Sequence, residues 1–263
     1  GNIFLDVETA SEADLPAVGT HVYFEHPSTR VILLDAVLDS GERIKWTEGE
    51  PPPPALLMAV LLGWTFWAHN VLFEKLAFEK VLVPHWGFML PVRWGCTMAR
   101  ARYNGLPGSL DAAAHALKLQ TTKDLRGQRL MLQMCRPRAI EADGTRRWWH
   151  LEDPAKVARL HDYCLVDALL CQLVHKYTRA LPEREELAWA AVMRMNERGI
   201  QVDRDFAQAA ARMAEQEQLR INGELKQITM GRVDKATKVK ALKQWLAELQ
   251  IPLASLDKRQ VQH

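Results

Sequence analysis

Three apolar segments, far apart in the 263-residue sequence, each carry acidic residues that the fold must either gather or keep apart. Asp6 and Glu8 follow the apolar start of the chain, Glu74 closes a second segment, and Tyr163 precedes Asp167 by four positions in a third. The first segment has the pattern of a buried strand, and the other two have the spacing of amphipathic helices. Converging carboxylates repel one another unless cations bind between them. The sequence therefore favours a fold in which a strand end and two helices surround a metal site.

The order of the predicted elements indicates an α/β fold. Strands of an antiparallel meander are predicted in the first fifty residues, at positions 3–6, 22–25, 31–38 and 44–47. Four consecutive prolines, at 51–54, then interrupt the chain. A helix, a strand and a second helix are predicted after them, at 55–62, 64–68 and 71–81. Strands followed by alternating helices and strands predict a mixed sheet flanked by helices.

The next hundred residues have two helix start signals and one basic segment. Ser109 is a predicted N-cap for a helix over 109–117, and Asp153 with Pro154 begins a long helix that runs to about Tyr177. Between them, residues 118–147 hold eight Lys or Arg against three Asp or Glu. We expect this stretch to be a mobile or insertion-like region.

After residue 180 the strand signal disappears. Helices are predicted at 183–198, 203–225 and 237–249, with a short turn between the first two. We therefore expect two domains, an α/β domain over 1–180 and a smaller helical segment over 181–263.

Composition excludes several classes of protein. Lys and Arg number 34 against 32 Asp and Glu, a net charge of +2, which is too balanced for a histone-like binder but allows a local basic face. The four cysteines form no Cys-x-x-Cys pair, so zinc-ligand spacing is absent and reduced thiols are expected. The apolar run at 55–63 is too short to cross a bilayer. We expect a cytoplasmic protein with no membrane partner.

Each acidic motif also has an ordinary structural explanation. An Asp-x-Glu triplet is expected roughly once by chance in a chain of this composition. Asn70 can cap a helix whose dipole favours a solvated Glu74, and His69 can be a packing residue. Tyr163 can be half-buried packing, whereas an acid at position 167, within an apolar helix, is costly unless it is paired or bound to a metal. The joint occurrence of the three motifs is more specific than any one of them.

Together the three segments resemble the exonuclease motifs of the DEDD superfamily of 3′–5′ exonucleases. The third motif has Tyr163 four residues before Asp167, as in the tyrosine subtype; the histidine subtype would need a histidine at position 162, which is Asp. The resemblance covers residues 4–167 and implies a ribonuclease H-like fold. The second motif usually ends in Asp, and this chain has Glu74 instead.

The same resemblance implies the roles of the site residues. Asp6, Glu8, Glu74 and Asp167 would be ligands of two divalent cations, Mg²⁺ or Mn²⁺, as expected for oxygen donors. Tyr163, with Glu8, would orient the attacking water. The resemblance implies hydrolysis of the terminal phosphodiester to a nucleoside 5′-monophosphate.

A second resemblance extends beyond the nuclease motifs. The segments 97–100, 105–110 and 186–203 resemble bacteriophage family A DNA polymerases, in which a proofreading exonuclease domain precedes the helical start of the polymerase domain. The palm and fingers motifs of that family do not occur in these residues. The resemblance therefore implies exonuclease plus part of the thumb, with a single-stranded DNA 3′ end, primer–template DNA and the remaining polymerase domain as partners.

Basic and aromatic residues are candidates for contact with the nucleic acid. The predicted strand-binding residues are Thr9, Asn70, Phe73, Lys123, Arg126 and Arg129. Further candidates are Arg136 and Arg138, a second basic stretch formed by Arg232, Lys235, Lys238, Lys240 and Lys243, and the stacking pair Trp148 and Trp149. For the basic residues a solvated charged surface is an equally good explanation. For Trp64 and Trp67 core packing is the better one.

Two other functions remain open at this point. A ribonuclease of the same superfamily would carry the same motifs, although the polymerase-like segment argues against it. A catalytically weak or dead DNA-binding module of a polymerase would explain Glu74 in place of Asp.

Overall fold

The computed structural model describes residues 1–87, 91, 93–119, 125–251, 253, 255 and 256. Contacts divide the chain into two compact units, Gly1–Glu197 and Arg198–His263. Helix α10 (Glu183–Arg198) belongs to the first unit except for its last residue. Its side chains Trp189 and Met193 contact a small apolar cluster at the end of the sheet. The functional boundary near residue 180 stays a prediction.

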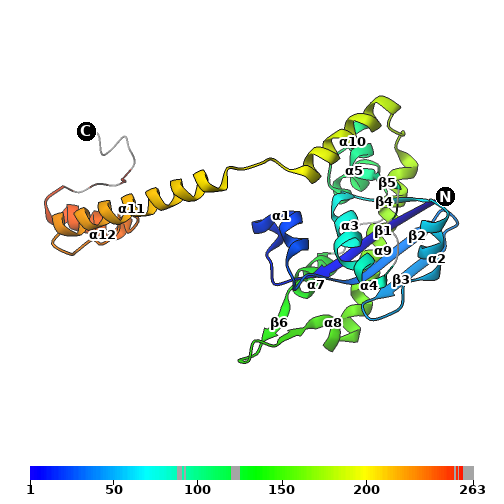
Figure 1. Cartoon of the computed structure of the whole chain (residues 1–263), viewed down its shortest axis with the longest axis horizontal. Coiled ribbons are helices and arrows are strands. Elements are labelled where there is room, and N and C mark those ends of the chain that lie inside the picture. Colours follow the sequence, from blue (N-terminus) through cyan, green and yellow to red (C-terminus); the bar gives the residue numbers. More distant parts are fainter. Residues whose placement is uncertain (88–90, 92, 120–124, 252, 254, 257–263) are drawn as a thin grey trace. The chain divides into compact units, whose positions relative to one another are not determined.

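Among the described residues, a five-stranded mixed sheet forms the centre of the first unit (Figure 1). Its strands, in spatial order, are β3 (Arg43–Thr47), β2 (Arg30–Leu38), β1 (Asn2–Ala10), β4 (Thr65–Ala68) and β5 (Arg93–Cys96). The first three strands pair antiparallel, whereas β4 and β5 run parallel to β1. The carboxyl ends of β1 and β4 therefore meet at the same edge of the sheet.

Alternation along β1 separates the core from the acids. Ile3, Leu5 and Val7 point to one face and join the largest apolar cluster, whereas Asp6 and Glu8 point to the other. Four short elements and α1 (Leu15–Glu25) complete that first cluster: α2 (Pro54–Leu61), α3 (Leu72–Ala77), the π-helix η1 (Phe78–Leu82) and α4 (Val83–Trp86). The apolar spacing that predicts a helix over 71–81 is confirmed by α3 and η1.

The long helix α9 (Pro154–Tyr177) crosses the opposite face of the sheet and contacts β1 and β2 (Figure 1). Its predicted start is confirmed, because Asp153 accepts a hydrogen bond at 3.1 Å from the backbone N–H of Lys156 and Pro154 occupies the first turn. Shorter helices pack beside it: α5 (Thr97–Tyr103), α6 (Leu110–Ala116), α7 (Leu125–Met134) and α8 (Trp149–Glu152). Ser109 caps α6 as predicted, at 3.3 Å from the N–H of Ala112.

Two predictions from the sequence are wrong. Residues 22–25 end helix α1, which starts after Asp14 with proline in its first turn, and the apolar pair Tyr23 and Phe24 is buried on the inner side of that helix. The basic segment is no mobile insertion over its described part, since α7 buries Leu130 and Met134 in a core cluster against α9. It continues into a hairpin of β6 (Pro137–Ile140) and β7 (Arg146–Trp148).

The second unit contains α11 (Arg204–Ile228) and α12 (Val239–Glu248), which confirm two of the predicted helices. Asp203 caps α11, accepting a hydrogen bond from the N–H of Phe206 at 2.9 Å. Large apolar side chains of this unit remain exposed, among them Phe206, Leu219 and Met230. The helical hairpin thus buries little of its own apolar surface among the residues described.

The α/β class, with a mixed sheet flanked by helices, is confirmed, and the strand order is consistent with the ribonuclease H-like fold implied by the motifs. Within the described parts of the chain, no helix combines the length and apolar character needed to cross a bilayer.

Candidate active site

One cavity of about 630 Å³ gathers all five residues that the motifs nominate. It opens where β1 ends, between α1, α3, α7 and α9, and its walls include Asp6, Glu8, Glu74, Tyr163 and Asp167. Three segments separated by up to about 160 positions in the sequence thus meet at one edge of the sheet.

The positions of four of these side chains follow from the strand and helix periods. Asp6 and Glu8 lie two apart on β1 and so share the face that α9 covers. Tyr163 and Asp167 are four apart on α9 and so share the side that faces β1. The Cys164 thiol donates to the backbone carbonyl of Asp6 at 3.2 Å, which fixes the helix against the strand at this point.

Glu74 enters the cavity from α3, which follows β4 at the same sheet edge. Its side chain is only 4% exposed, and burial, followed by the nearby charge of Asp6, raises the pKa of Glu74 well above its ordinary value. Among the described residues its Oε2 atom has no hydrogen-bond partner. A buried carboxylate in this state is costly unless a cation neutralises it.

The donor set fits hard divalent cations, since the four carboxylates offer only oxygen. Within the described chain, however, no three acidic, histidine or cysteine side chains are already close enough to hold one ion. The acids line the cavity without forming a finished coordination shell. Side-chain rotation of Glu74, which has one more methylene than Asp, would have to contribute to closing it.

An apolar wall faces the acids across the cavity. It is formed by side chains of α1, α3 and α7, namely Leu15, Pro16, Tyr23, Phe73, Met131 and Leu132. The Tyr23 hydroxyl and Thr9 Oγ1 are hydrogen-bonded at 2.9 Å, and burial raises the pKa of Tyr23 to about 12, so the phenol stays neutral. Phe73 packs edge-on against Phe24 at 4.9 Å. This wall suits the flat apolar face of a base or sugar.

Arg136 supplies positive charge to the described lining of this acidic cavity. It lies just after α7 and donates to Asp14 at 2.9 Å across the cavity mouth. Both side chains of this pair are largely exposed, 65% and 51%, and such pairs contribute about 0–1 kcal/mol. A phosphate can therefore displace Asp14 from Arg136 at small cost.

The structure separates the predicted strand-binding residues into three groups. Thr9 and Phe73 line the cavity, as the prediction requires. Asn70 is exposed in the left-handed region, at φ 72°, does not cap α3 with its side chain and is not part of the cavity wall. Arg126 and Arg129 lie on exposed positions of α7, outside the lining. Lys123 lies outside the described residues.

His69 and the tryptophan pair have structural roles. The ring nitrogens of His69 contact Thr97 Oγ1 at 3.0 Å and the carbonyl of Gly108 at 2.9 Å, which leaves neither available as a ligand. Trp148 is buried in the core beneath Arg30, and Trp149 is covered by Arg138 and Lys156. The proposed stacking role of the Trp148 and Trp149 pair is therefore not supported, since neither ring lines the acidic cavity.

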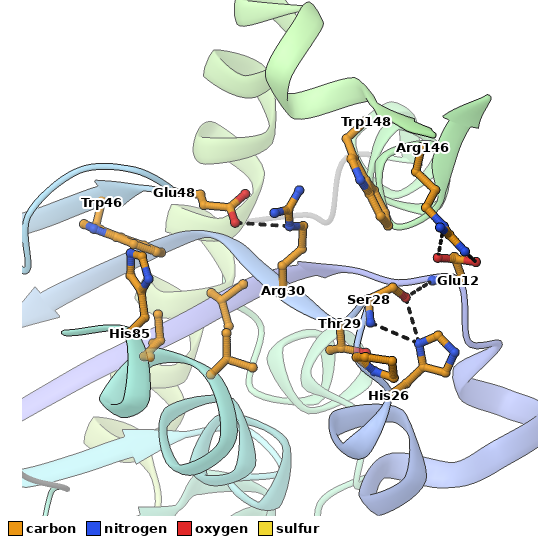
Figure 2. Close-up of a pocket in the computed structure, with 14 residues that line it drawn as sticks. Glu12, His26, Ser28, Thr29, Arg30, Trp46, Glu48, His85, Arg146 and Trp148 are labelled. Atoms are coloured by element: carbon orange, nitrogen blue, oxygen red, sulfur yellow. Dashed lines mark hydrogen bonds and ion pairs between the residues drawn. The ribbon is translucent and has the colours of Figure 1, made fainter. Parts of the chain in front are cut away.

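A second cavity, of about 600 Å³, lies beside the start of β2 and has a different character (Figure 2). Its charged groups are already paired: Arg30 with Glu48 at 3.1 Å, and Arg146 with Glu12 at 3.1 Å. Oε2 of Glu48 also lies 2.8 Å from Nε2 of His150. Acidic and basic side chains alternate in this lining, whereas the described lining of the first cavity is mainly acidic.

The sequence analysis did not predict helices α1 and α7, which form part of the cavity wall. The signal for α1 was Asp14 followed by a proline two positions later, a helix start that the alternating apolar residues at 22–25 outweighed. The signal for α7 was the four-residue spacing of Leu130 and Met134 within a basic segment. Both helices contribute the apolar side of the cavity.

Comparison with known proteins gives one strong match. No protein-family model matches the chain. A DNA polymerase of Bacillus phage SP02 is 31% identical over 268 residues, a match that covers 98% of this chain and 40% of that polymerase. The chain thus spans well under half the length of this relative. Among solved structures, Brucella melitensis NrnC bound to pGG matches with a TM-score of 0.39 and 14% identity, over 66% of this chain and 72% of that one. The expected resemblance to a bacteriophage DNA polymerase is confirmed.

Proposed function

We propose, from the similarity of nearly the whole chain to a stretch of a phage DNA polymerase, that residues 1–180 form a proofreading 3′–5′ exonuclease domain. One observation carries the proposal: Asp6, Glu8, Glu74, Tyr163 and Asp167 line a single cavity. The substrate would be the 3′ end of single-stranded DNA, and the products would be nucleoside 5′-monophosphates.

Asp6, Glu8, Glu74 and Asp167 would hold two divalent cations, Mg²⁺ or Mn²⁺. When bound, such ions lower the pKa of an attacking water and neutralise the charge that develops on the phosphodiester. The Oε2 atom of Glu74, which has no hydrogen-bond partner among the described residues, and the nearby charge of Asp6 support this role, because a cation would neutralise the buried Glu74 carboxylate.

The protein's own groups would orient the reaction. Tyr163 and Glu8 would hold the water in line with the scissile bond, and the apolar wall with Phe73 would receive the terminal nucleoside. Arg136 would bind a backbone phosphate at the mouth after leaving Asp14. Neutral Tyr23 keeps its hydrogen bond with Thr9 throughout, so this wall stays fixed.

The direct test follows a 5′-labelled single-stranded DNA in Mn²⁺. We expect stepwise shortening by one nucleotide from the 3′ end, release of monophosphates, and loss of activity in EDTA. Internal cleavage, or cleavage that resists EDTA, would contradict the proposal. An RNA of matched sequence should be degraded more slowly; the reverse preference would favour a ribonuclease.

Replacing Arg136 and replacing its partner Asp14 should change KM in opposite directions. Arg136→Ala should raise KM about fivefold to tenfold with kcat nearly unchanged, because it removes a charge-assisted hydrogen bond that contributes about 1–1.4 kcal/mol to binding. It should also make the plot of log binding constant against log salt concentration less steep, by the slope of about one phosphate contact. Asp14→Asn, which releases Arg136, should lower KM by about twofold to fivefold.

Steady-state kinetics at two salt concentrations measure both effects, with Arg43→Ala as the control. Arg43 is exposed on β3, outside the cavity, and its replacement should leave KM unchanged. Equal KM values for Arg136→Ala and the wild type would remove Arg136 from the substrate site.

A DNA-binding module with weak or no cleavage is the second candidate. Glu74 in place of the family's Asp, and acids that line the cavity without a finished ion shell, favour it. Titration with Mn²⁺ separates the two candidates, because such a module should show no paired cation sites.

The helical segment 181–263 would be the start of a polymerase thumb. Its exposed apolar residues, such as Phe206 and Leu219, would contact the remaining polymerase domain, and its basic stretch would hold primer–template DNA. Two residues of that stretch are already paired, Arg232 with Glu248 and Lys238 with Asp234. We also propose that the protein acts in the cytoplasm, as its four free cysteines favour.

A further inference from the structure

Helix α7 lies so close to α9 that its backbone touches the ring of Tyr163. Gly127, in the first turn of α7, is buried at this contact. A Cβ atom at position 127 would lie 2.5 Å from Cδ2 of Tyr163, 3.2 Å from Cγ and 3.3 Å from Cβ. The first distance is shorter than packed carbon atoms allow, so only glycine fits while the ring keeps its present position.

Glycine has a low propensity for the helical conformation, so a glycine within a helix calls for an explanation. The chain offers a contrast in Gly223 of α11, where an added Cβ would meet nothing within 4 Å. Gly223 can be replaced at no steric cost, whereas Gly127 cannot. Glycine at position 127 therefore destabilises the helix slightly, but it allows α7 to approach the tyrosine closely.

The same helix also forms part of the cavity wall. Met131 and Leu132 of α7 line the cavity, and Leu130 and Met134 anchor the helix in the cluster that contains Tyr163. Tyr163 itself is only 6% exposed. The ring is thus held between α9, which carries it, and the backbone of α7.

We propose that Gly127 is a positioning residue, which lets the backbone of α7 set the place of the Tyr163 ring in the acidic cavity. This inference rests on the proposed exonuclease function, in which Tyr163 orients the attacking water. Gly127 would act only through that ring. A displacement of about 1 Å in a group that orients a reactant can cost on the order of 100-fold in rate.

The first test compares Gly127→Ala with Gly223→Ala in the full chain. On single-stranded DNA with Mn²⁺, Gly127→Ala should lower kcat roughly 10- to 100-fold and change KM by less than about twofold. Gly223→Ala, the same chemical change in an open helix position, should leave both constants unchanged. An unchanged kcat in Gly127→Ala would overturn the inference.

A double mutant separates positioning from general damage to the fold. Tyr163→Phe keeps the ring but removes the hydroxyl, so adding Gly127→Ala to it should lower kcat by no more than about twofold. An equal loss of kcat in the Tyr and Phe backgrounds would show that Gly127 does not act through Tyr163.

Met134→Ala covers the case in which Gly127→Ala does not fold. It loosens the anchor of α7 without adding an atom at the contact, since Met134 is fully buried in the same cluster. It should lower kcat in the Tyr163 background and have little effect on kcat in Tyr163→Phe. Equal loss in both backgrounds would again overturn the inference.

Fluorine NMR tests the contact without reference to activity. The chain has four tyrosines, and labelling with 3-fluorotyrosine gives each a signal, of which the Tyr163 signal is identified by its loss in Tyr163→Phe. Gly127→Ala should shift that signal most, and Gly223→Ala should shift none. If the wild type is inactive but Gly127→Ala still shifts the Tyr163 signal, the exonuclease proposal is contradicted and the contact is supported. If Gly127→Ala leaves the Tyr163 signal unmoved, the contact itself is contradicted.

Discussion

Asp6→Ala and Asp167→Ala should each lower the rate of 3′-nucleotide release by about 10³-fold or more and leave the fold intact. Both carboxylates line the acidic cavity, from β1 and from α9, and both would be cation ligands. Losing several kcal/mol of charge stabilisation costs a factor of ten in rate for each 1.4 kcal/mol. Quenched-flow or gel assays with end-labelled DNA measure the loss.

Helix α9 supplies the matched control for this experiment. Asp162 is exposed, one position before Tyr163, and Asp162→Ala removes the same group from the same helix. We expect it to retain full activity. Full activity in Asp6→Ala or Asp167→Ala, with circular dichroism unchanged, would refute the assignment of the cavity as the nuclease site.

Glu74→Gln should stabilise the metal-free protein while it removes activity. In the folded state burial and Asp6 raise the pKa of Glu74, so the folded, metal-free protein holds this proton more tightly than the unfolded chain does. The free energy of unfolding therefore falls as pH rises from the ordinary glutamate value of 4.5 through the raised pKa of Glu74. Glutamine removes this loss.

The expected gain at pH 8 is about 1–3 kcal/mol, the usual cost of a buried polar group without a partner. For a unit of this size it corresponds to a rise in Tm of roughly 2–10 °C. At pH 4 or below, where Glu74 is protonated in both states, the two proteins should have similar stability. Mn²⁺ should raise the Tm of the wild type and change that of Glu74→Gln much less, because binding to the folded state stabilises it.

Thermal melts at the two pH values, with and without Mn²⁺, measure these differences. Glu79→Gln is the control, since Glu79 is exposed on η1 and its replacement should leave the Tm unchanged at both pH values. A lower Tm of Glu74→Gln at pH 8 in the absence of metal would show that Glu74 supports the fold as a paired group. Glu74 would then have to leave the proposed ligand set.

Local sequence patterns were enough to predict the parts of the fold that follow from the repeat of one strand or one helix. The acids of β1 and the pair on α9 follow from alternation and from four-residue spacing, and Asp153 marks the start of α9 in the sequence itself. These predictions needed no information about distant contacts. The meeting of the acids in one cavity does not follow from any single period; it was expected from three acid-bearing apolar segments taken together and from the resemblance of their motifs.

Elements whose periodicity was ambiguous were predicted less well. Tyr23 and Phe24 are compatible with a strand, and only their packing under the sheet decides for a helix. In the basic segment, the many charged residues outweighed the helical spacing of Leu130 and Met134, the two apolar residues that anchor α7. The burial of Trp148 could not be predicted from its own segment, because two arginines precede it and its partners, such as Ile32, come from distant elements.

The alternation of β1 also governs how this chain can change in evolution. One strand supplies apolar side chains to the core on one face and carboxylates to the cavity on the other. Deleting or inserting a single residue before Asp6 would turn the Asp6 side chain toward the core and bring that of Leu5 or Val7 to the face that now carries the acids. Length variation among relatives should therefore be absent from β1 and accumulate in connections such as the turn at 39–42 between β2 and β3.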